Sequence, residues 1–200
     1  MYITMKSRHY SIAVVFALLL TSIASLADEV FNSEESFKSP VSVPAPIVAH
    51  LTKALGSEKT STCQVSRPHD MFEAQLIDLN KSTKAFLVKP ARMCLCEANN
   101  CPMWVFKAKG SPSKPLWSSP STKTFTLLDK TLNGYKKLRE VSADATNDRE
   151  SIWSWNKDSY VEIYKHVWIW DTEKRCRSGE ETTQLMDGQM VERTRQCTQE

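Results

Sequence analysis

Glycine is scarce in this chain, with 5 glycines among 200 residues, and no glycine-rich loop of the kind that cradles phosphates is present. The Gly-x-Ser-x-Gly and His-Glu-x-x-His motifs are also missing, and no nucleophilic cysteine stands beside a histidine. Histidine is equally scarce, with 4 in the whole chain. The sequence therefore indicates no nucleotide-binding loop, no serine hydrolase motif and no zinc peptidase motif. It predicts a protein that is not an enzyme and has no cofactor.

Long apolar runs are also lacking. The longest, Ile12–Leu20, is too short to cross a membrane as a mature helix. Basic residues precede it, and the small residues Ser25 and Ala27 follow at the −3 and −1 positions of a cleavage site. Residues 1–27 are therefore predicted to be a signal peptide, with an uncleaved anchor as the alternative. We expect a periplasmic or secreted protein with no stable membrane span after cleavage.

The mature chain lacks a strong charge of either sign. Removing Lys6 and Arg8 with the signal leaves 24 basic residues of the original 26, against 23 acidic residues. A net charge this small supports no uniform attraction to nucleic acid or to an anionic membrane. We therefore expect no nucleic-acid partner.

Six cysteines lie in the mature part, and an even number in an exported chain favours disulfides. Cys96 and Cys101 flank a short turn, and the predicted Asp187-Gly188 hairpin brings Cys176 and Cys197 together, which leaves Cys63 with Cys94. The alternative is a metal cluster of Cys94, Cys96 and Cys101 with His69. That cluster lacks a second regularly spaced ligand pair, so no metal site is predicted.

The hydrophobic pattern predicts a mainly β fold of antiparallel sheets, as a meander, sandwich or blade-like unit, with α+β as the minor alternative. Residues 28–45 lack periodicity and are predicted to be a flexible N-terminal arm. A short helix is predicted over 46–55, between Pro46 and Gly56. Alternation from Phe72 onward is typical of strands. Residues 46–200 are therefore expected to form a single disulfide-stapled, β-rich domain.

One turn carries a resemblance. Residues 78–83, Asp-Leu-Asn-Lys-Ser-Thr, lie between two predicted strands, and this arrangement is similar to the DLNGDG hairpin of FG-GAP-type repeats, which often hold calcium. The turn here lacks the third Asp and the Gly, and Lys81 and Lys84 stand where a dication would sit. A plain hairpin is therefore favoured over calcium at Asp78, Asn80 and Ser82.

A broader resemblance covers Phe72 to Trp170. The order of DLN hairpin, cysteine turn, tryptophan strand, Asn-Gly-Tyr turn and tryptophan/tyrosine hairpin resembles small exported bacterial β-proteins of uncharacterised role. The resemblance implies a periplasmic address and a β-rich fold, and it implies no activity.

The strands after residue 150 are rich in aromatic side chains. Alternation places Tyr160, Glu162, Tyr164, His166, Trp168 and Trp170 on one face of a strand, with branched apolar residues opposite. One interpretation is a second core layer. The other is a binding face for a sugar or a protein, whose candidate residues are Trp153, Trp155, Tyr164, Trp168 and Trp170.

Three functions remain open from the sequence. The first is an exported binding protein that contacts another protein, for instance an inhibitor or immunity factor for a cell-wall-directed enzyme. The second is a carbohydrate- or peptidoglycan-binding module that uses the aromatic face. The third is a hydrolase that uses two carboxylates, although the sequence singles out no pair.

Overall fold

The computed structural model describes residues 27–61, 63, 67–110, 114–184 and 188–197. Residues 1–26 of the expected signal peptide lie outside this part, as does Asp187 of the expected hairpin turn. Within the described part, no helix has the length and apolar character needed to span a membrane.

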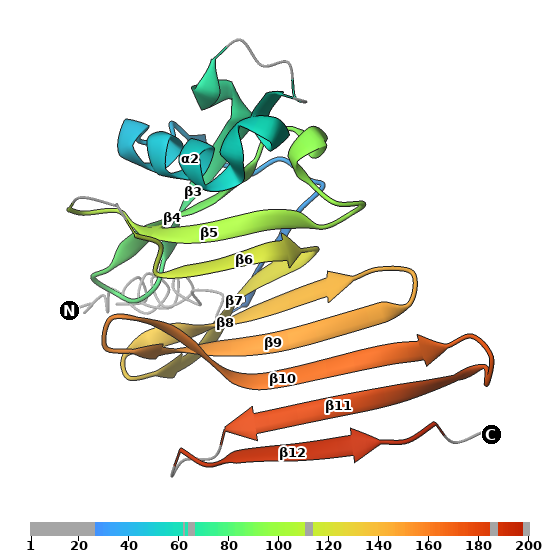
Figure 1. Cartoon of the computed structure of the whole chain (residues 1–200). Helices are drawn as coiled ribbons and strands as arrows, with labels where there is room; N and C mark the ends of the chain where they lie inside the picture. The colour runs from blue at the N-terminus through green and yellow to red at the C-terminus, as the bar shows by residue number, and fades with distance from the viewer. Residues whose placement is uncertain (1–26, 62, 64–66, 111–113, 185–187, 198–200) are drawn as a thin grey trace, which may run out of the picture.

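Two antiparallel sheets make up most of the fold (Figure 1). The five-stranded sheet B has the order β2-β3-β4-β5-β6, and the seven-stranded sheet A has the order β1-β7-β8-β9-β10-β11-β12. The strands of sheet B are β2 Pro40–Val41, β3 Phe72–Asp78, β4 Lys84–Pro90, β5 Cys101–Lys107 and β6 Trp117–Thr122. Those of sheet A are β1 Glu29–Asn32, β7 Thr124–Leu132, β8 Tyr135–Ala143, β9 Asn147–Asn156, β10 Ser159–Asp171, β11 Cys176–Gln184 and β12 Met190–Arg195. The mainly β prediction is confirmed.

In the part of the chain that the structure describes, one α-helix, α2 Ala45–Ser61, covers one face of sheet B (Figure 1). Ile47 and Leu51 are fully buried and belong to a core cluster with Trp104 and Phe106 of β5. The helix begins where the sequence predicts and is interrupted at Gly56, whose φ of 77° and ψ of 162° are not helical. Among the described residues there are also two short 3₁₀ turns, η1 Pro68–Met71 and η2 Met93–Leu95.

The main core lies between the two sheets. Sheet B contributes Leu87 and Val105, and sheet A contributes Phe125 and Leu138, all with no exposed surface. The molecule is therefore a helix layer, a central sheet B and a sheet A. This arrangement gives each face of sheet B a cover, whereas sheet A is covered on one side only.

Residues 28–45 are not a flexible arm, and this prediction is corrected. Glu29–Asn32 pairs with β7 as strand β1, and Phe37 is buried in the main core. The buried ammonium of Lys89 donates to the Ser33 carbonyl at 2.9 Å and pairs with Glu73 at 2.6 Å. Backbone pairing and a few scattered side chains, Phe31, Phe37 and Val43, hold this segment. Neither produces the side-chain periodicity by which a strand is recognised in a sequence.

Three disulfides join the six cysteines in the expected pairs, Cys63–Cys94, Cys96–Cys101 and Cys176–Cys197. The first two hold the chain around η2 between the helix layer and β5. The third joins the start of β11 to the residues that follow β12. Such a set of bonds is consistent with an oxidising compartment.

The far half of sheet A extends past sheet B. In Figure 1, β11 and β12 lie at the end of the molecule away from α2. In the part of the chain that the structure describes, the only elements in extensive contact with β11 are its neighbours β10 and β12. Within β11 and β12 only Cys176 and Gly179 are buried, and no residue of these strands belongs to a described core cluster. Both faces of this half of the sheet are therefore largely open, whereas a sheet usually buries at least one face. This open half is the most unusual feature of the fold.

Candidate functional site

A β-bulge in β10 decides which side chains face outward. The pairing of β10 with β9 runs through Glu162↔Trp153 and then Tyr164↔Ile152, so Ile163 is an extra residue without a partner. Side chains alternate along a strand, so one extra residue moves all later side chains to the other face. Even-numbered side chains of β10 therefore face the core side of sheet A before the bulge and the outer side after it.

The first consequence is that Trp153 and Trp155 lie on the core side of sheet A. Trp153 meets Trp117 edge-on with ring centroids 6.3 Å apart, and Trp155 stacks on Tyr135 at 4.3 Å. Both pack against the main core, where Tyr160 is also buried. The bulge therefore divides the aromatic residues that were expected on a single face. The sequence contains no visible mark of the bulge, so this division could not be predicted.

The second consequence is an aromatic row on the outer face of sheet A, made of Tyr164, His166, Trp168 and Trp170. The His166 ring lies 4.3 Å from the Trp168 ring and 6.4 Å from the Tyr164 ring, measured between centroids. Trp170 is 40% exposed, which makes it one of the most exposed large apolar residues of the described chain. Three of the five aromatic residues predicted for a binding face are thus brought together here.

A glycine sets the position of Trp168. Gly179 of β11 is directly opposite Trp168 of β10. A Cβ atom placed on Gly179 would stand 2.9 Å from two carbons of the indole ring and 3.3 Å from the His166 Nε2. The indole therefore lies against the bare backbone of β11, and the side chain as a whole is half-buried.

An open pocket of about 270 Å³ lies at the Trp170 end of the row. Its lining includes Trp168 and Trp170 from β10, Arg177 from β11, and Asp148 from β9. Arg177 donates to Asp148 at 3.2 Å, so a carboxylate and a guanidinium stand side by side next to two indoles. The pocket thus combines flat apolar surfaces with hydrogen-bond donors and acceptors.

The rim of the pocket is a tight turn between β8 and β9. The Asp144 carboxylate accepts hydrogen bonds from the backbone N–H groups of Thr146 at 2.8 Å and Asn147 at 2.7 Å. These bonds hold the pKa of Asp144 below its ordinary value, so the group is ionised at neutral pH. The Thr146 carbonyl accepts from the backbone N–H of Trp170 at 2.8 Å, which joins the turn to the row.

At the other end of the row, Tyr164 is flanked by carboxylates. Partial burial, Glu181 and Glu150 together raise the pKa of the Tyr164 phenol. Glu150 is itself paired with Arg139 at 2.6 Å. The phenol therefore stays protonated above its ordinary range and keeps a hydrogen-bond donor on the outer face.

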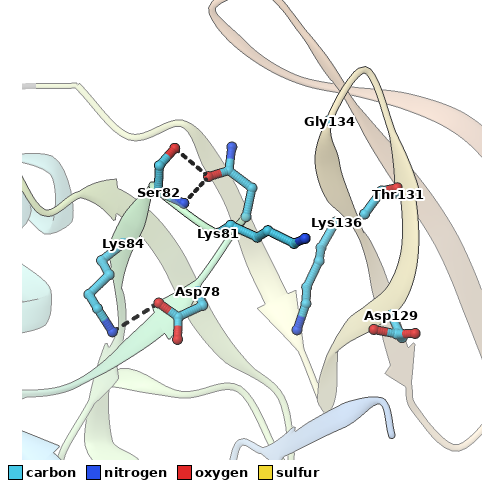
Figure 2. Close-up of a pocket in the computed structure, with 9 residues that line it drawn as sticks. Asp78, Lys81, Ser82, Lys84, Asp129, Thr131, Gly134 and Lys136 are labelled. Carbon is cyan, nitrogen blue, oxygen red and sulfur yellow. Dashed lines mark hydrogen bonds and ion pairs between the residues drawn. The ribbon is translucent and has the colours of Figure 1, made fainter. Parts of the chain in front are cut away.

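A larger pocket, about 790 Å³, lies elsewhere, between the DLN turn and the β7–β8 hairpin (Figure 2). The side-chain oxygens of Asn80 and Asp78 in its lining are already engaged. The Asn80 side chain accepts from the backbone N–H groups of Ser82 at 2.9 Å and Thr83 at 2.7 Å, and Asp78 pairs with Lys84 at 2.9 Å. Figure 2 also shows Lys81 at the pocket. This is the geometry of a plain hairpin, with lysines where calcium would need oxygens.

Buried carboxylates in the sandwich do not form an accessible site. Glu140 is 1% exposed, accepts from Arg149 at 2.7 Å and also accepts from Ser119. Within the described residues, no three His, Cys, Asp or Glu side chains gather as a metal site requires. The cysteines of the alternative metal cluster, Cys94, Cys96 and Cys101, are all bonded in disulfides.

Comparison with protein-family models, with curated proteins and with solved structures finds no match for this chain.

The site contains residues that sequence reasoning did not select. Asp148, Arg177 and Gly179 reach the aromatic row only through the pairing of β10 with β9 and β11. The Asp144-Ala145-Thr146-Asn147 turn has the composition of a side-chain-capped turn, and this was the one signal available in the sequence.

Proposed function

We propose that this protein is an exported glycan-binding protein, periplasmic or secreted, whose site is the pocket at Trp168 and Trp170. The observation that carries the proposal is the combination of two partly exposed indoles with the Asp148–Arg177 pair in one open pocket. A sugar ring has an apolar face of C–H groups and a rim of hydroxyls. The indoles offer a flat surface to the former, and the ion pair offers acceptors and donors to the latter.

Binding is favoured over hydrolysis at this pocket. Glycoside hydrolysis needs one carboxyl group that is protonated and able to act as an acid. Asp144 has a lowered pKa and its oxygens accept hydrogen bonds within the turn, while Asp148 is paired with Arg177. Neither is placed to deliver a proton, so the protein is proposed to hold its ligand without cleaving it.

A second candidate is contact with another protein, as an inhibitor or immunity factor would make it. The observation that favours it is the open half of sheet A, where Ile169 on the inner side and Met190 at the edge are 42% and 55% exposed. Aromatic residues and arginines are the residues that most often dominate protein interfaces. The glycan proposal ranks first because the pocket, rather than the apolar residues, is where the polar groups converge.

The test is calorimetric titration of the oxidised mature protein with soluble cell-wall glycan fragments, together with pelleting on intact sacculi. The expected result is saturable binding that Trp170→Ala weakens at least tenfold. Because Trp170 is 40% exposed and the rest of its side chain is covered, the same change should also lower the free energy of unfolding by about 1–2 kcal/mol.

The matched control is Leu132→Ala, which removes an exposed apolar side chain, 45% exposed, on the β7–β8 hairpin away from the row. It should bind glycan as the wild type does. No binding of any glycan by the folded wild-type protein, with retention of one discrete protein from an extract instead, would reject the glycan proposal in favour of the second candidate.

A further inference from the structure

The outer face of sheet A carries a line of arginines beside the aromatic row, and this line bears on the chemistry of the ligand. In the pairing of β11 with β12, Gly179 is opposite Arg195 and Glu181 is opposite Arg193. Residues opposite each other in antiparallel strands share a face. Arg193 and Arg195 therefore share the outer face with Trp168, whose own partner on β11 is Gly179.

No side chain stands between Trp168 and Arg195. Gly179 separates them on β11, and the Trp168 indole lies over its backbone. Strands are about 4.8 Å apart, so the Cα atoms of Trp168 and Arg195 are about 10 Å apart across two strands. An arginine side chain extended toward β10 therefore brings its guanidinium to the edge of the indole.

Arg177 has an ion-pair partner and Arg193 has a carboxylate opposite it in the register, whereas Arg195 is opposite a glycine. Arg177 pairs with Asp148 at 3.2 Å, and Arg193 is opposite Glu181 in the register. Arg195 is exposed and opposite a glycine, and among the described residues it makes no ion pair or side-chain hydrogen bond. A guanidinium without a partner at the rim of an aromatic platform is suited to a planar anion, because its donors match a carboxylate in pairs.

We infer that the glycan is an acidic one, in which a sugar ring stacks on Trp168 and its carboxylate binds Arg195. This inference rests on the proposed glycan function and specifies the ligand of the same site. Uronic acids and lactyl-substituted amino sugars both present a carboxylate on a pyranose ring, and the experiment below separates these two sources.

The third disulfide supports the arrangement by holding Arg195 in place. Cys197 follows Arg195 by two residues and is bonded to Cys176 at the start of β11. An edge strand in an open half of a sheet has hydrogen bonds on one side only, so its end frays readily. The bond joins that end to β11 and limits fraying of the strand that carries Arg195.

The experiment titrates the oxidised protein at low and high salt with three probes: an oligogalacturonate, a muramic-acid-containing disaccharide and a neutral oligomer of N-acetylglucosamine. At least one acidic probe should bind ten times more tightly than the neutral one at low salt, and high salt should reduce that ratio. Arg195→Gln should bring the ratio close to one while leaving neutral-glycan affinity within about twofold. Arg193→Gln, the control that removes the same charge one register position away, should keep the preference.

The outcomes separate the two proposals. Equal binding of acidic and neutral glycans, or an acidic preference that persists in Arg195→Gln, overturns the acidic ligand and leaves the glycan-binding function standing. Absence of binding to all three probes by a folded protein overturns both.

Discussion

Replacing Gly179 by alanine tests the geometry of the site through a single carbon atom. The new Cβ would stand 2.9 Å from two carbons of the Trp168 indole, closer than side chains pack, so the ring must lift from the sheet. Gly179 lies in strand β11 with no positive φ, so alanine is compatible with its backbone. Alanine in a strand gains about 0.5–1 kcal/mol over glycine from the unfolded chain.

The gain from alanine in the unfolded chain and the loss of ring packing oppose each other in stability. Binding is affected by the displaced ring. Lifting a partly exposed ring loses about 1 kcal/mol of packing, so the free energy of unfolding should change by less than about 1 kcal/mol. The stacking surface moves with the ring, and glycan affinity should fall about tenfold or more. Ring displacement also changes the environment of Trp168, so the tryptophan fluorescence should shift.

The assay is denaturant unfolding and glycan titration of Gly179→Ala beside Ser178→Ala. Ser178 is opposite Ile169 and points to the other face of β11, so its replacement should leave affinity unchanged. Wild-type affinity in Gly179→Ala, with unchanged fluorescence, would refute the idea that the indole lying over this glycine forms the ligand surface.

Three further predictions concern the scaffold. Serine at both Cys176 and Cys197 should lower the free energy of unfolding by about 3 kcal/mol, because the loop that this disulfide closes spans 21 residues. Hydrogen exchange should rise in β12 while β5 stays protected. Equal loss of protection in both strands would contradict this prediction. Asp144 has a folded pKa below its unfolded value, so it stabilises the protein above pH 3.8, and this contribution disappears as the pH falls through the folded value. Asp144→Asn should therefore be less stable than the wild type at pH 7, and the difference should shrink as the pH falls below 3.8. A constant difference in stability across pH would contradict this prediction. Lys89→Met should lower the free energy of unfolding by about 2–3 kcal/mol, because it leaves the Glu73 carboxylate without its partner at 2.6 Å. Adding Glu73→Gln should restore part of this loss, as measured by thermal unfolding. If stability does not recover, the Lys89–Glu73 pair is not what holds the N-terminal strand.

Local patterns were sufficient to predict much of the fold. Alternation identified β3 and β10, and Pro46 marked the start of the helix, which Gly56 interrupts. Turn signals paired Cys96 with Cys101 and Cys176 with Cys197, and Cys63–Cys94 followed by elimination. In each case the signal lies in residues close together in the chain, where periodicity and turn chemistry act directly.

The site was harder to predict because it depends on register. Whether Trp153 shares a face with Trp168 depends on Ile163 being an extra residue in β10, and a strand of alternating residues carries no mark of such a bulge. The neighbours Arg177 and Arg195 reach the aromatic row from β11 and β12, and only long-range pairing places them there. The same limitation explains β1, whose residues pair with β7 almost a hundred positions away.

The most direct measurement of the central claim follows the indole N–H signals of the 6 tryptophans by nuclear magnetic resonance while an acidic oligosaccharide is added. The claim predicts that the signals of Trp168 and Trp170 shift and saturate together, while those of Trp117 and Trp153 in the core stay in place. Shifts confined to the core signals, or no shift at any tryptophan at millimolar ligand, would contradict the claim that the outer face of sheet A is a glycan-binding site.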